Sequence, residues 1–158
     1  MLNGSHGAMD PLGLYIRQCP RVAGALAFGL MTLVAQHFTW LPHARTSGLP
    51  LTIAAGLAHA IAGAITGPRL VDGRRTRTPS QAVLLGAGTS LFALAIFAPL
   101  FAVFLFATDI HPAGPLSYVA LPLLIAVFAF LGDGWALFVV SIGVGWALYR
   151  TAACRATA

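Results

Sequence analysis

The chain contains no lysine and no glutamate, and it has very little charge of any kind. Its nine arginines and four aspartates make up 8% of the 158 residues, whereas a soluble domain carries about 25% charged residues. Apolar residues account for 58% of the chain, more than the polar surface of a soluble protein of this size could cover. This composition excludes a disordered chain and a nucleic-acid-binding domain with an ordinary surface. It predicts an integral membrane protein.

Cysteines and catalytic motifs are also scarce. Two cysteines, Cys19 and Cys154, are too few for a disulfide scaffold. The sequence offers no glycine-rich phosphate loop, no Ser/His/Asp set and no pair of acidic residues for acid–base work. With four aspartates and no glutamate, little remains for hydrolysis or phosphoryl transfer. We therefore expect a protein that is not an enzyme.

Long apolar runs are what the chain does have. A bilayer core of about 30 Å needs about 20 apolar residues per helix. Four stretches meet this requirement, over about residues 22–41, 49–67, 81–106 and 117–149. Residues 1–15 form a short tail, and no part of 1–158 remains for a soluble domain. The predicted fold is an all-α integral membrane protein, a single domain of four transmembrane helices.

The fourth stretch is too long for a simple span. A straight helix over residues 118–149 would be ~48 Å long at 1.5 Å per residue, which tilt seldom absorbs. Pro122 and Gly132–Gly134 are the two places where such a helix can kink or break. We expect the interruption at one of them.

The arginines predict the orientation of the helices. If the chain crosses four times, eight arginines lie on one side and only Arg45 lies on the other. Arginine-rich loops stay in the cytoplasm, so both termini are predicted to be cytoplasmic, in a membrane such as the bacterial inner membrane. The loop after the second helix is also expected to meet anionic lipid headgroups. Its arginines are Arg69, Arg74, Arg75 and Arg77.

Small and polar residues recur at spacings of three and four in the first two helices. Such stripes let helices approach closely in lipid, so we expect these helices to form a hairpin, packed face to face. The first stripe comprises Ala25, Gly29, Thr32, Gln36 and Thr39, and the second comprises Thr52, Gly56, His59, Gly63 and Thr66. The third helix instead carries many phenylalanines, which suit a surface facing lipid, pigment or another subunit.

Asp133 and His59 are the candidate site residues inside the membrane. Asp133 is the only carboxylate within an apolar run, and an ionisable residue at that depth is a functional hypothesis by default. Both residues are about ten positions in from the outer ends of their helices, so they could meet near the mid-plane. Such a pair would suit a proton relay, or a histidine that ligates haem or a chlorophyll-type pigment. The alternatives are a helix cap for Asp133 and a neutral interhelical hydrogen bond for His59.

A second group of candidate ligands lies at the predicted outer face. Imidazole and carboxylate groups bind zinc, copper or iron. The group comprises His37, His43, Asp109 and His111. Its spacing matches no strong metal motif, and turn-forming residues are the alternative interpretation.

Three functions are compatible with these features. The leading hypothesis is a non-enzymatic accessory or assembly subunit of a larger membrane complex, with other membrane subunits as partners. The alternative is a subunit that binds a cofactor or handles protons through His59 and Asp133. A third is a small-solute transporter that works as an oligomer, because four helices enclose little pathway.

Overall fold

The computed structural model describes residues 11–40, 48–72, 78–108 and 114–153, and it gives only the backbone for 37–40, 48–50, 108, 133 and 153. These ranges are helical and contain no strand, which confirms the all-α prediction. The elements are α1 (Pro11–Gln18), α2 (Pro20–Trp40), α3 (Gly48–Val71), α4 (Pro79–Thr108), α5 (Ser117–Ala129), the π-helix η1 (Phe130–Gly134) and α6 (Trp135–Ala153).

The helices of the described chain include three that are long and apolar enough to cross a membrane. These segments are Leu51–Val71, Pro79–Ala107 and Trp135–Ala152. The number rises to four if α1 and α2, which are bent by 108° at their junction, count as one span. The chain therefore has the helices of a membrane protein, with three to four candidate spans.

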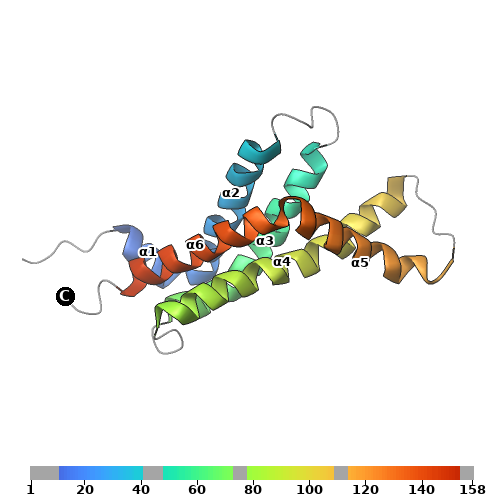
Figure 1. Ribbon diagram of the computed structural model, residues 1–158. Helices are drawn as coiled ribbons and strands as arrows, with labels where there is room; N and C mark the ends of the chain where they lie inside the picture. Colours follow the sequence, from blue (N-terminus) through green and yellow to red (C-terminus); the bar gives the residue numbers. More distant parts are fainter. Residues whose placement is uncertain (1–10, 41–47, 73–77, 109–113, 154–158) are drawn as a thin grey trace, which may run out of the picture.

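Part of the N-terminal segment that we expected to be a tail is helical. The 108° bend sets α1 roughly perpendicular to α2. Ile16 is buried, and the Arg17 guanidinium donates a hydrogen bond of 2.6 Å to the carbonyl of Ala152 near the end of α6. At this contact the two ends of the described chain, α1 and the end of α6, lie next to each other (Figure 1).

Helices α2 and α3 form the most extensive helix pair, which confirms the predicted hairpin. Glycines allow the close approach. A Cβ atom at Gly63 would collide with the carbonyl oxygen of Gly24, and one at Gly67 would collide with that of Pro20. Gly24 and Gly67 lie outside the stripes identified in the sequence. The tightest part of the interface is therefore nearer the start of α2 than the stripes indicated.

Helix α4 packs against α6 at one end and against α5 at the other. At the first contact, a Cβ on Gly86 would lie 2.6 Å from the Ser141 carbonyl oxygen. At the second, Phe97 is buried in a cluster that includes Ile125 of α5, and its ring stacks 5.5 Å from Phe101. The expectation that the phenylalanines of this helix form an open surface is therefore wrong for Phe97, because it is buried in a cluster with alanines of α3 and with Ile125 of α5.

The long fourth stretch bends at the second of the two expected positions. The π-helix η1 contains Gly132 and Gly134, and the chain changes direction there between α5 and α6 (Figure 1). Pro122 lies inside α5 without ending it. A π-turn inserts one extra residue into the helical hydrogen-bond pattern, which is enough to produce a bend.

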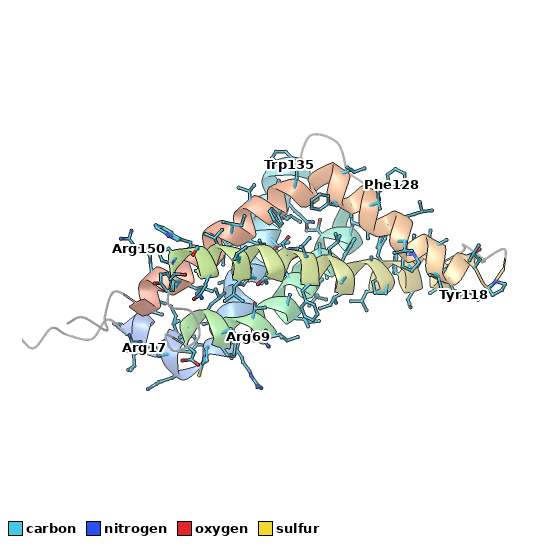
Figure 2. All side chains as sticks on the ribbon, turned by 60° about the horizontal axis from the view of Figure 1, so that its bottom comes forward. Arg17, Arg69, Tyr118, Phe128, Trp135 and Arg150 are labelled. Carbon is cyan, nitrogen blue, oxygen red and sulfur yellow. The ribbon has the colours of Figure 1, made fainter. Side chains whose placement is uncertain are left out.

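Three of the described arginines lie toward one end of the molecule. Figure 2 shows Arg17, Arg69 and Arg150 toward the end where α1 meets α6, and Tyr118 at the opposite end, beyond the bend. Arg150 stacks over the ring of Trp146 at 5.0 Å. A charged end with an aromatic neighbour is typical of a helix bundle that meets headgroups at that end.

Candidate functional site

A cavity with three polar side chains lies where the α2–α3 pair meets α4 and the bend. Gln36 of α2, His59 of α3 and Ser90 of α4 contribute the polar side chains, and Gly134 of η1 contributes backbone. The rest of the wall is apolar: Leu51, Ala55, Leu91, Leu94, Phe97, Ala129, Phe130 and Leu137. The three polar side chains are all buried. Four elements that are distant in sequence thus place polar groups around one space.

One ring nitrogen of His59 has a hydrogen-bond partner, and the other has none among the described residues. Its Nδ1 lies 3.0 Å from the carbonyl oxygen of Ala55, one turn earlier in α3. Because a carbonyl only accepts, Nδ1 carries the proton and donates, which leaves Nε2 as an acceptor in the neutral ring. Nε2 is buried and has no hydrogen-bond partner in the described part of the chain. The hydrogen bond that the described residues show for His59 thus lies within its own helix, and an interhelical bond of Nε2 stays a prediction.

The position of His59 places this nitrogen deep in the predicted span. The apolar segment of α3 runs from Leu51 to Val71. His59 lies about 12 Å from its start and about 18 Å from its end, at 1.5 Å per residue. An unpaired polar atom in such surroundings costs about 1–3 kcal/mol. A water molecule or another hydrogen-bond donor in the cavity would offset that cost.

Asp133, the expected partner of His59, is described only by its backbone, which lies in η1. Its side chain is outside the described residues, so the pair stays a prediction. The next residue, Gly134, lines the same cavity as His59. The alternative in which Asp133 caps a separate half-helix at Trp135 is weakened, because η1 leads directly into α6. The backbone of Asp133 is thus adjacent in sequence to a residue that lines the cavity.

The predicted outer metal group cannot be assembled from the described residues. His43, Asp109 and His111 lie outside them, and the side chain of His37 does too. Within the described part of the chain, no three His, Cys, Asp or Glu residues are grouped closely enough to hold a metal ion.

His59 offers a suitable donor atom for a haem or chlorophyll-type pigment, but the cavity is too small to hold one. A histidine whose Nδ1 donates to a carbonyl presents Nε2 to a metal, which is the usual arrangement of an axial ligand. The cavity, however, has a volume of about 60 Å³, whereas pockets for drug-sized ligands and cofactors measure about 300–1,000 Å³. A macrocycle would have to displace the apolar wall. The cavity fits water or a small polar solute instead, since a water molecule occupies ~30 Å³ in the liquid.

Sequence reasoning identified His59 but assigned Gln36 only to helix packing. It also missed a polar contact between α3 and α4, in which the Thr89 hydroxyl oxygen lies 2.9 Å from that of Thr66. The signal was present: Gln36 and Thr66 belong to the two small-residue stripes. What the stripes could not indicate is which of their polar members face a third helix.

Comparison with known proteins identifies no relative for this chain. No family model, no curated protein and no solved structure matches it. The chemistry of the cavity is therefore the basis for the functional proposal.

Proposed function

We propose that the protein is a non-enzymatic, proton-handling membrane subunit, with His59 as the group that accepts and releases the proton. The observation that carries this proposal is the buried Nε2 of His59, which has no hydrogen-bond partner among the described residues, at a small, mostly apolar cavity that Gln36 and Ser90 also line. Histidine is the side chain whose charge changes most readily near neutral pH. The chain would act in a bacterial inner membrane, with its arginine-rich end toward the cytoplasm.

The small volume of the cavity and the polar side chains in its wall favour water as its occupant over a bulky ligand. Such water could carry protons. About 60 Å³ accommodates roughly two water molecules. Such water can donate to Nε2 and also reach the hydroxyl of Ser90 and the amide of Gln36, because all three line the same space. Asp133 would supply the second ionisable group, from the residue next to Gly134. The two groups together would exchange a proton through the water of the cavity.

The test is proton flux through purified protein in liposomes, driven by a potassium gradient with valinomycin and followed with an internal pH dye. We expect the internal pH of liposomes that contain wild-type protein to change faster than that of empty liposomes. His59→Gln and Asp133→Asn should each slow this flux by at least about tenfold, because each removes one proton-transfer group. Asp72→Asn is the matched control. It makes the same change at an exposed carboxylate at the end of α3 and should leave the flux unchanged.

A second readout is independent of flux. In protein labelled with ¹⁵N-histidine, His59 should give the signals of a neutral ring protonated at Nδ1, as its bond to Ala55 requires. The proposal would be refuted by wild-type flux equal to that of empty liposomes. It would also be refuted by a slowing of flux in Asp72→Asn as large as that in Asp133→Asn.

The role of an accessory or assembly subunit is a second candidate, and it rests on the surface of α5. No residue of α5 is buried. Large side chains on and around this helix are well exposed, including Leu116 at 79%, Phe128 at 70% and Leu131 at 71%. Partner subunits would be identified by mild detergent extraction from native membranes, cross-linking from a photoreactive residue at position 128, and mass spectrometry. Cross-links to lipid alone would contradict this second candidate.

A further inference from the structure

A groove with two arginines lies at the arginine-rich end of the α2–α3 hairpin. It is lined by Arg21, Ala64, Ile65, Pro68 and Arg69, and its volume is about 430 Å³. Arg21 is in the first turn of α2 and Arg69 is in the last turn of α3. Gly67 packs against the backbone of Pro20, so the two helix ends that carry the arginines are held next to each other. The groove therefore combines two cations from two elements.

The apolar part of the groove continues along α3 as a stripe of exposed side chains. Ile65 is 52% exposed and follows Ile61, Leu57 and Ile53 at intervals of four residues, each of them 46–57% exposed. Residues spaced by four lie along one side of a helix. The stripe thus runs from the two arginines into the predicted membrane span. A charged site followed by an apolar track of this kind matches a lipid, with its headgroup at the end and an acyl chain along the helix.

The charges indicate the class of headgroup. Arginine binds phosphate oxygens through its planar fork of N–H donors, and two arginines can hold one phosphate. Asp72 lies three residues after Arg69, so Arg21, Arg69 and Asp72 together carry a formal charge of +1. This charge complements a phosphodiester headgroup that lacks a cationic amine and therefore has a net charge of −1. We infer that the groove binds one anionic phospholipid of the phosphatidylglycerol class, with its phosphate between Arg21 and Arg69 and one acyl chain along Ile65 and Ile61. The site is separate from the cavity at His59.

Native mass spectrometry of delipidated protein in detergent tests this inference. The probes are phosphatidylglycerol and phosphatidylcholine with the same acyl chains, titrated separately. Wild-type protein should bind one phosphatidylglycerol in preference to phosphatidylcholine. Arg21→Gln/Arg69→Gln should weaken that binding about 30-fold, or about 2 kcal/mol, as expected for two arginines near an anionic headgroup. Arg150→Gln is the matched control, because Arg150 is an exposed arginine that stacks on Trp146 of α6.

A further variant distinguishes a lipid from free phosphate as the natural ligand. Ile65→Trp would fill the apolar part of the groove and leave both arginines in place. It should weaken phosphatidylglycerol binding, whereas inorganic phosphate should compete poorly in wild-type protein. Circular dichroism would establish that each variant keeps its helix content. The inference is overturned if the double arginine variant binds phosphatidylglycerol like wild type, if both lipids bind wild type equally, or if Ile65→Trp has no effect and inorganic phosphate displaces the lipid.

Discussion

Replacing Gly63 by alanine tests whether the α2–α3 interface depends on backbone contact. Gly63 faces Gly24 so closely that an added methyl group would collide with the Gly24 carbonyl oxygen and would lie 2.9 Å from the Phe28 ring. Ordinary contacts of this kind are 3.4–4 Å. Neither neighbour can yield easily, because one is backbone and Phe28 is only 1% exposed. The two helices would therefore have to separate.

The expected loss of stability is the difference between two effects. Overpacking a tight site costs about 1–3 kcal/mol, while alanine in place of glycine favours a helix by up to about 1 kcal/mol. We expect Gly63→Ala to lower the free energy of unfolding by about 1–2 kcal/mol. Gly56→Ala should cost less, because its added methyl would meet the end of the Leu33 side chain, which is 37% exposed and can move. The sequence stripe alone treats Gly56 and Gly63 as equivalent.

Equilibrium unfolding in mixed micelles of dodecylmaltoside and increasing SDS, followed by circular dichroism, measures these differences. Gly143→Ala is the matched control, because nothing in the described structure lies within 4 Å of the methyl group it would add. That variant should be as stable as wild type or slightly more stable. If Gly63→Ala and Gly143→Ala agreed within about 0.5 kcal/mol, close backbone packing would not be what holds α2 to α3.

Two further predictions concern helix α4. Gly86→Ala should destabilise the protein by about 1–2 kcal/mol in the same unfolding assay, because its methyl would meet the Ser141 backbone. Gly88→Ala should not, since no atom of the described residues lies within 4 Å of the added methyl. Equal effects of the two substitutions would count against the α4–α6 contact. Thr89→Val should cost about 0.6 kcal/mol, the average for a polar contact between helices in a membrane, because it removes the hydroxyl next to Thr66. Thr89→Ser should restore stability, and a loss that persists in the serine variant would point to packing instead.

Several features were predictable because they depend on residues close together in the chain. The apolar runs and their lengths are local, and a bilayer leaves a single chain segment few choices other than a helix, since each backbone group must be paired internally. The hairpin of α2 and α3 was predictable from small residues at Gly29, Gly56 and Gly63. The bend near Gly134 was predicted as one of two options, because two glycines next to Asp133 weaken a helix as plainly as Pro122 does.

The candidate site was only partly predictable. His59 could be singled out because an ionisable group in an apolar helix is rare, but nothing local shows that its Nδ1 would bond to Ala55 and leave Nε2 facing a cavity. Gln36 and Ser90 come from other helices. Their side chains line the same cavity as His59 only when each helix has a particular rotation about its axis and a particular position along it. The two arginines of the groove, Arg21 and Arg69, are likewise far apart in sequence.

The sequence alone determined that the chain is a helical membrane protein, which segments of it form the long apolar helices, and that its arginines lie outside those apolar segments. These follow from composition and from a periodicity that a single helix contains. The tertiary structure decided which glycines touch, that Phe97 is buried in a cluster with residues of α3 and α5, and which polar side chains share the space around His59. The physical reason is that helix contacts are set by the mutual fit of two surfaces. Backbone approach at Gly24 and Gly63, and at Gly86 and Gly145, fixes the register from which the cavity and the groove both result.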